Sequence, residues 1–218
     1  MRSALDKARE APASTKARIL AAAEEVFATK GFAGASTREI ATRARVNISS
    51  LHYHWESKET LYFAVFQSIY DRILDLVRRS IPARADEVTP GRQVIEEAMG
   101  TLFDFFADHP NVPKLLVRRL LEDEQSDVDI EGNILVPAWR LFASWTKELN
   151  GDRLKQLDSQ LFMFSVHSVL LLFLLDSRHF TSLLGGSVYT PGVRQRVRAH
   201  IISLVQKLLV HHEGEGTS

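Results

Sequence analysis

The sequence contains no cysteine. Disulfides, thiolate metal sites and thiol-based redox sensing are therefore excluded, and the cytoplasm is the expected compartment. A long apolar run is also missing, because the most apolar stretch, 161–175, is interrupted by Ser165, His167 and Ser168 and falls short of a membrane span. Residues 1–15 lack the apolar core of a signal peptide. We expect neither secretion nor a membrane partner.

The motifs of the common enzyme classes are absent as well. No G-x-S-x-G elbow, phosphate-binding loop, HExxH pair or paired cysteine occurs in the sequence. The acidic stretch 122–131 lacks a glycine at the position where a calcium-binding loop needs one, so it is expected to be a solvated loop. We predict no enzymatic activity, no cofactor and no metal site.

Positive and negative charges balance over the whole sequence, but they are unevenly distributed along it. Residues 1–60 carry ten Lys or Arg against seven Asp or Glu, a balance of +3, and residues 61–218 carry seventeen against twenty, a balance of −3. A modestly basic head on a modestly acidic body permits DNA binding by the head without establishing it.

Apolar residues recur at helical spacing along most of the chain, and no alternating strand pattern or fixed repeat occurs. A first helix runs from Ser14 to a stop at Gly31, Ser36 or Thr37 can cap a second, and Asn47 can cap a third. Further helical patterns cover about 57–80, 92–108, 111–123, 131–149, 153–177 and 192–210. The sequence therefore predicts an all-α protein of about nine helices, with the helix at 57–80 as connector.

The segment 37–58 is the most informative part of the sequence, since two short helices lie three residues apart in it. This spacing is typical of a helix-turn-helix, whose second helix enters the DNA major groove while the first crosses the backbone. Ser49 and Ser50 are small enough to let the backbone approach the bases. Residues 52–54 and Lys58 can donate hydrogen bonds to phosphates. The plain alternative is a small helical subdomain with an aromatic core.

The order and spacing of these residues resemble the TetR family of bacterial repressors. The resemblance runs through residues 22–32, 37–41 and 51–61. It implies an N-terminal three-helix DNA-binding domain and a C-terminal helical domain for ligand binding and dimerisation. By resemblance, three groups of residues contact operator DNA: Thr37 and Arg38 from the second helix, Ile48, Ser49 and Ser50 at base edges, and His52, His54 and Lys58 at phosphates.

The sequence departs from the family pattern at several of these positions. Arg45 stands in the turn where the family usually has glycine, and a left-handed conformation there would cost an ordinary residue roughly 1 kcal/mol or more. Ile48 places an apolar group where a polar reader is common; it can touch a thymine methyl or pack against the helices. Trp55 can be structural, and Tyr53 can be structural or donate to a phosphate.

The sequence predicts a flexible polar arm at 1–13, a DNA-binding domain at 14–60 and a body at 61–218, which by resemblance is an effector-binding and dimerisation domain. Aromatic residues are concentrated in the last of these, enough to line an apolar cavity. The candidate pocket residues are Phe103, Phe106, Leu120, Trp139, Phe142, Trp145, Phe164 and His167. Each of these rings can equally be core, and His167 can bind a ligand or be a satisfied core or interface histidine.

The apolar helices at 153–177 and 192–210 are predicted to form a homodimer interface, because a helix that is apolar nearly all round needs cover on every side. The candidate interface residues are Leu171, Leu175, Val197, Ile201 and Val205. The predicted function is a sequence-specific, DNA-binding transcriptional repressor that a small apolar or aromatic effector releases from its operator. Two alternatives stay open: a DNA-bound adaptor of the same fold whose body binds a protein, and a helical enzyme or carrier with a vestigial head.

Overall fold

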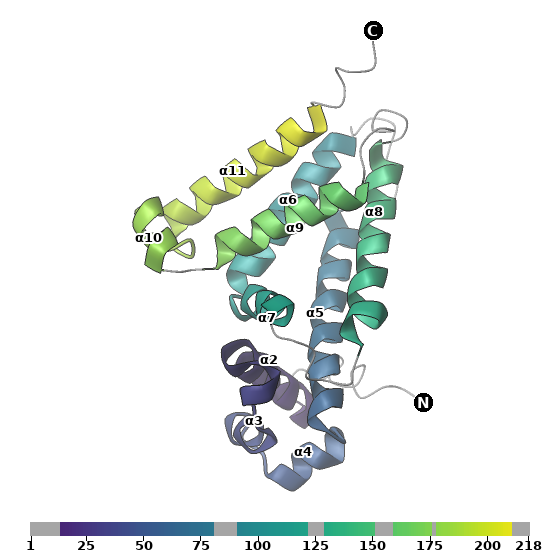
Figure 1. Ribbon diagram of the computed structural model, residues 1–218, viewed down its shortest axis with the longest axis vertical. Helices are drawn as coiled ribbons and strands as arrows, with labels where there is room; N and C mark the ends of the chain where they lie inside the picture. The colour runs from purple at the N-terminus through teal and green to yellow at the C-terminus, as the bar shows by residue number, and fades with distance from the viewer. Residues whose placement is uncertain (1–13, 81–90, 122–128, 151–158, 176–177, 211–218) are drawn as a thin grey trace. The chain divides into compact units, whose positions relative to one another are not determined.

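The computed structural model describes residues 14–80, 91–121, 129–150, 159–175 and 178–210. Within this part of the chain it contains ten α-helices, one π-helical turn and no strand (Figure 1). The predicted all-α class is therefore confirmed. The predicted N-terminal arm and most of the acidic stretch lie outside the described residues.

The chain forms two compact units. The first, the head unit, comprises Met1–Arg72 and Asn111–Leu135, and the second, the body unit, comprises Ile73–Pro110 and Val136–Ser218. The functional boundary at residue 60 stays a prediction. The compact head unit extends past it and includes a segment that the sequence analysis assigned to the body.

The helices of the head unit include the two short ones that the sequence analysis predicted. They are α2 (Thr15–Gly34), α3 (Thr37–Arg43), α4 (Ile48–His54), the first part of α5 (Lys58–Ser80), α7 (Asn111–Leu121) and the π-helical turn η1 (Glu131–Leu135). The regular part of α2 stops at Gly31, as predicted, because this glycine has φ 72° and ψ 179° and interrupts the helix.

Side-chain caps fix where α3 and α4 begin. Of the two candidates for the first cap, it is Ser36 whose Oγ accepts the backbone N–H of Glu39 at 3.2 Å. Asn47 Oδ1 accepts the N–H of Ser50 at 2.6 Å, as the sequence predicted. Each cap satisfies one of the N–H groups that a helix start leaves unpaired, which typically stabilises the helix by about 1 kcal/mol.

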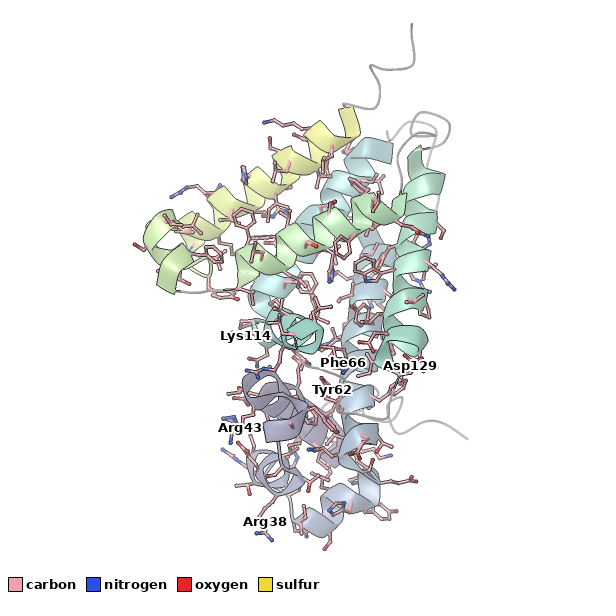
Figure 2. The ribbon with its side chains drawn as sticks, in the orientation of Figure 1. Arg38, Arg43, Tyr62, Phe66, Lys114 and Asp129 are labelled. Atoms are coloured by element: carbon pink, nitrogen blue, oxygen red, sulfur yellow. The ribbon has the colours of Figure 1, made fainter. Side chains whose placement is uncertain are left out.

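An aromatic cluster forms the core of the head unit. The rings of Phe27 and Tyr62 meet edge to face at 4.8 Å between centroids, and Phe32 and Phe66 each lie 5.0 Å from Tyr62. Figure 2 labels Tyr62 and Phe66 on α5. All four side chains are buried, so α2 is held against the first half of α5 by apolar burial and aromatic packing.

The body unit consists of longer helices. They are the remainder of α5, α6 (Gly91–Asp108), α8 (Val136–Asn150), α9 (Ser159–Leu174), α10 (Arg178–Leu184) and α11 (Pro191–Val210). Helix α6 contacts α8, α9 and α11, and α9 also contacts α8 and α11. The short helix α10 was not predicted. None of the described helices combines the length and apolar character needed to cross a membrane.

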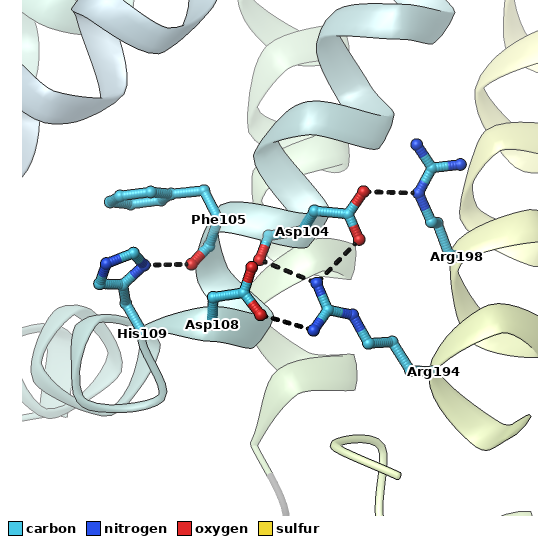
Figure 3. Close-up of polar contacts among 6 residues, drawn as sticks. All are labelled: Asp104, Phe105, Asp108, His109, Arg194 and Arg198. Carbon is cyan, nitrogen blue, oxygen red and sulfur yellow. Dashed lines mark hydrogen bonds and ion pairs between the residues drawn. The ribbon is translucent and has the colours of Figure 1, made fainter. Parts of the chain in front are cut away.

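A charged network joins α6 to α11 (Figure 3). The Arg194 guanidinium donates to Asp108 Oδ1 at 2.6 Å and to Asp104 Oδ1 at 3.0 Å. Arg198 Nε donates to the other oxygen of Asp104 at 2.9 Å. A hydrogen bond from Arg194 holds the pKa of Asp108 below its usual value. These bonds orient two helices whose apolar faces supply most of the burial.

Candidate DNA interface

The turn between α3 and α4 is closed by two backbone hydrogen bonds. The N–H of Arg45 donates to Thr42 O at 3.1 Å, and that of Val46 donates to Ala41 O at 3.0 Å. This pair is the Schellman motif that ends many helices, and its central residue is left-handed and usually glycine. Arg45 has φ 55°, the only positive φ outside glycine among the described residues. The left-handed turn is thus present despite the arginine.

Ion pairs connect α2 with α3. Lys30 Nζ lies 2.8 Å from Glu39 Oε2, and the Arg43 guanidinium lies 2.9 Å from Glu25 Oε1. Both pairs are partly exposed, so each contributes no more than about 1 kcal/mol. Arg38, labelled with Arg43 in Figure 2, is exposed and forms no ion pair within the described residues. Its charge is available to a ligand, as the predicted DNA contact requires.

Helix α4 has one exposed and one buried face. Its exposed face carries Ile48, Ser49, His52 and Tyr53. Leu51 on the opposite face is fully buried in the head unit. The side chain of Ile48 is 39% exposed, so of its two predicted roles the surface position favours contact with a ligand over packing.

The two aromatic residues for which a structural role was predicted have opposite environments. Trp55 is buried, in agreement with that role. Tyr53 is 85% exposed, which favours the phosphate contact over a structural role among the two roles predicted for it. The physical reason is the helical period: Tyr53 lies one turn after Ser49 on the outer face of α4. Tyr53 therefore stays a candidate DNA contact.

The remaining predicted contacts of α3 and α4 are less accessible. Thr37 and Ser50 are half-buried. His54 is also half-buried, and its Nδ1 is buried without a hydrogen-bond partner among the described residues. Burial, and secondly the charge of Lys16, lower the pKa of His54. The imidazole is neutral near pH 7. Because Nδ1 is buried, Nε2 is the nitrogen of His54 that can contact a phosphate.

Lys58 is bound inside the head unit. Its Nζ donates to Phe32 O at 3.0 Å and to Ala35 O at 3.3 Å, and it lies 4.3 Å from the centroid of the Phe32 ring. These are carbonyls at the end of α2, where a cation is favoured. The phosphate contact predicted for Lys58 requires Nζ to leave both oxygens.

Helix α7 completes the head unit through contacts that no local sequence pattern signals. The Arg118 guanidinium donates to Thr29 O on α2 at 3.0 Å. Arg119 forms two hydrogen bonds with Glu131 of η1, at 2.9 and 2.7 Å, and is buried. A buried arginine requires such a bidentate partner. The pairing joins residues that only the tertiary structure brings together.

Most of the candidate pocket residues lie in the body unit, where their rings pack in pairs. Trp139 lies 5.6 Å from Phe164 and 5.1 Å from His167 between ring centroids, and Phe142 lies 5.6 Å from Trp145. The buried members of the set are Phe103 and Phe106. The structure does not bring Leu120 to this cluster: it belongs to the head unit and is 69% exposed.

His167 lies on α9 beside Trp139. Burial lowers the pKa of His167 to about 4, so its imidazole is neutral at pH 7. A neutral imidazole offers one donor and one acceptor to a neighbour or ligand. Both readings left open for this residue are compatible with that state.

The residues predicted at the dimer interface are mostly core. Leu171, Val197, Ile201 and Val205 are all buried within the single chain, and Leu175 is half-buried. The helical pattern identified apolar positions correctly but did not reveal which neighbours cover them. The predicted dimer interface on these two helices stays a prediction.

Three large apolar side chains of α9 are more than half exposed and form a stripe. Leu161, Phe164 and Leu172 are 65%, 57% and 55% exposed. Ser165 and Ser168 lie exposed between them, at positions one turn apart on the same side of the helix. We call Leu161, Phe164 and Leu172 the α9 stripe.

Helices α2, α3 and α4, with small, apolar and hydrogen-bonding side chains exposed on α4, have the arrangement of a helix-turn-helix module. Residues 19–65 match the family described as "Bacterial regulatory proteins, tetR family". The matched segment is similar to the DNA-binding domain of the TetR family of bacterial transcriptional regulators. Members of this family are regulators and not enzymes.

Curated relatives match over the N-terminal part of the chain. The HTH-type transcriptional activator FasR of Mycolicibacterium smegmatis is 37% identical over 90 residues, which are 41% of this chain and 39% of the relative. The HTH-type transcriptional repressor NicS of Pseudomonas putida is 30% identical over 102 residues, 47% and 46% of the two chains. The chain thus spans less than half the length of these two relatives.

The fold is shared over most of the chain. A TetR-like transcriptional regulator from Rhodococcus sp. RHA1 superimposes with a TM-score of 0.65 at 18% identity, over 89% of this chain and 95% of that one. At 18% identity this likeness shows a shared fold alone, and the fold includes the body unit.

Proposed function

We propose that this protein binds operator DNA and represses transcription. The observation that carries the proposal is the exposed face of α4, on which Ile48, Ser49, His52 and Tyr53 stand clear of a buried Leu51. A helix of this length fits the major groove, with its first residues toward the bases and the later polar residues toward phosphates. Arg38 and Thr37 extend the contact from α3.

The regulator is proposed to act as a homodimer, because one head covers only one half-site and specific affinity usually requires two. The α9 stripe supports this assignment. Three large apolar side chains exposed on one side of a helix favour association. A second copy related by two-fold symmetry presents the same stripe, so the contact is self-complementary.

We propose a small apolar or aromatic effector for the body unit. The support is the paired rings around Trp139 and Phe142 and the neutral His167, which give aromatic walls and one hydrogen-bonding group. The effector releases the dimer from DNA only if it binds the non-DNA-binding state more tightly. Repression, not activation, is the proposed mode, as for the relative named repressor NicS.

Two measurements test this function. Selection of bound duplexes from a random pool is expected to yield a two-fold symmetric sequence that also occurs beside the coding region of the protein. Hydrophobic compounds are expected to quench tryptophan fluorescence and to release that duplex at the same concentration. Sites dispersed over the genome, without effector release, would instead favour the adaptor.

A further inference from the structure

Arg45 is held in a backbone conformation that arginine disfavours. It is the central residue of the Schellman motif after α3, with φ 55°. A left-handed residue with a Cβ is strained, whereas glycine adopts this conformation freely and asparagine does so more readily than most residues. The turn itself therefore requires no arginine at this position.

Among the described residues, no contact of the Arg45 side chain offsets the strain. The Arg45 side chain is exposed and forms no hydrogen bond, ion pair or ring contact within the described residues. Its neighbours differ in this respect, since Arg43 pairs with Glu25 and Lys30 pairs with Glu39. A strained residue whose side chain makes no stabilising contact is characteristic of functional positions.

The position of Arg45 indicates which function this is. Arg45 precedes by two residues the cap of α4, Asn47, and by three the first exposed residue of that helix, Ile48. Arg45 therefore stands in the turn that leads directly into α4, close in sequence to the face proposed to meet the bases. Groups at the flank of a recognition helix meet the sugar-phosphate backbone.

We propose that Arg45 is a DNA-contacting residue whose guanidinium binds a phosphate at the edge of the groove that α4 enters. The inference rests on the proposed operator binding and adds to it an affinity-determining residue. Arginine suits this contact because its planar guanidinium donates two parallel hydrogen bonds to a phosphate and keeps its charge at every physiological pH. Thr37 and Arg38 approach the DNA from α3, so Arg45 adds a contact from the turn.

Three substitutions separate the charge of Arg45 from its backbone strain. Arg45→Gly removes both, Arg45→Asn removes the charge and retains a residue that tolerates the left-handed region, and Arg45→Lys retains charge and strain. Arg140→Gln is the matched control, because Arg140 is an exposed arginine on α8 in the body unit. Each full-length variant is measured by thermal unfolding and by equilibrium binding to the selected duplex at several salt concentrations.

Arg45→Gly is expected to raise the midpoint of thermal unfolding by roughly 2–4 °C and to weaken DNA binding by roughly five- to thirtyfold. The slope of log affinity against log salt is expected to fall by about one unit for each head bound, on matched and altered duplexes alike. Arg45→Asn is expected to lose the same affinity and slope, and Arg45→Lys to keep most of both. Arg140→Gln is expected to leave the slope unchanged.

Three results would overturn the assignment. A more stable Arg45→Gly with wild-type affinity and slope would show that the arginine is only tolerated in the turn. A loss confined to duplexes with one particular base pair would make Arg45 a base contact. An equal loss of slope in Arg140→Gln would reduce the effect to net charge. Failure of the wild-type protein to bind any duplex is a separate result, which would reject the proposed function itself.

Discussion

At the scale of single residues, the end of α4 contains two buried nitrogens without hydrogen-bond partners in the part of the chain that the structure describes. Trp55 is 6% exposed, and its Nε1 has no hydrogen-bond acceptor among the described residues. His54 Nδ1 is also buried and has no hydrogen-bond partner among them. An unsatisfied buried donor typically costs about 1–3 kcal/mol. The indole N–H of Trp55 therefore offsets part of the stability gained by burying its ring.

Trp55→Phe removes this donor while keeping an aromatic ring in the head core. We expect the free energy of unfolding to stay unchanged or to rise by about 1 kcal/mol. Replacing a large buried aromatic side chain by a smaller one usually lowers stability instead. Urea unfolding followed by circular dichroism measures the difference. A loss of more than about 1 kcal/mol would mean that the N–H is satisfied or that ring volume dominates.

His167 predicts a pH dependence of stability. Its pKa is about 4 in the folded chain, below the value of 6.5 for an unperturbed histidine. Between these pH values the unfolded chain binds a proton that the folded chain does not, so stability falls as the pH drops from about 7 to 4. The full loss from this group is roughly 3 kcal/mol at most.

His167→Phe isolates this contribution, because the pKa of His54 is also lowered and titrates in the same direction. The variant is expected to lose less stability than the wild type between pH 7 and 4, by denaturant unfolding at each pH. Parallel curves for the two proteins would show that burial does not depress the His167 pKa in solution.

At the scale of helices, Lys58 joins the start of α5 to the end of α2. Because its Nζ already donates to the carbonyls of Phe32 and Ala35, Lys58→Ala is expected to lower the free energy of unfolding by about 1–2 kcal/mol. We expect the salt dependence of DNA binding to remain that of the wild type. If Lys58→Ala instead reduces the slope of log affinity against log salt by about one unit per head and leaves stability unchanged, the phosphate contact predicted from the sequence is supported.

The elements of the fold were predictable where short-range chemistry decides them. The caps at Ser36 and Asn47, the stop at Gly31 and the turn at Arg45 each depend on a few neighbouring residues. The exposed side of α4 was less accessible to such reasoning, which left two roles open for Tyr53. Its side of the helix depends on which face the rest of the head covers.

Long-range packing could not be read from the sequence. Ile201 and Leu171 have the pattern of an interface, yet other helices of the body unit bury them. Leu120 is an apolar residue in an apolar helix, yet it is exposed. The helical period shows which apolar residues share a face of a helix. It does not show which other helix packs against that face, because the tertiary structure decides this.

At the scale of the whole molecule, the α9 stripe and the core of α11 give opposite expectations for charged substitutions. Leu172 is 55% exposed and Ile201 is 1% exposed. Leu172→Asp is expected to give a folded monomer, because it places a charge in the proposed dimer contact. Ile201→Asp is expected to unfold the body unit, because it buries an unpaired carboxylate.

Sedimentation and circular dichroism of both variants check these expectations. A Leu172→Asp protein that remains dimeric and folded would move the interface away from the α9 stripe. A folded, monomeric Ile201→Asp protein would return it to the residues predicted from the sequence.

The central claim is that the exposed face of α4 reads DNA sequence. The most direct test compares the duplexes selected from a random pool by the wild type and by Ile48→Ala/Ser49→Ala, in which both changes lie on exposed positions and preserve the helix. We predict that the wild type selects a two-fold symmetric site, and that the variant remains folded but loses the preference at the base pairs nearest the start of α4 in each half-site. Identical selected sequences for the two proteins, or no selected sequence for the wild type at low salt, would contradict the account.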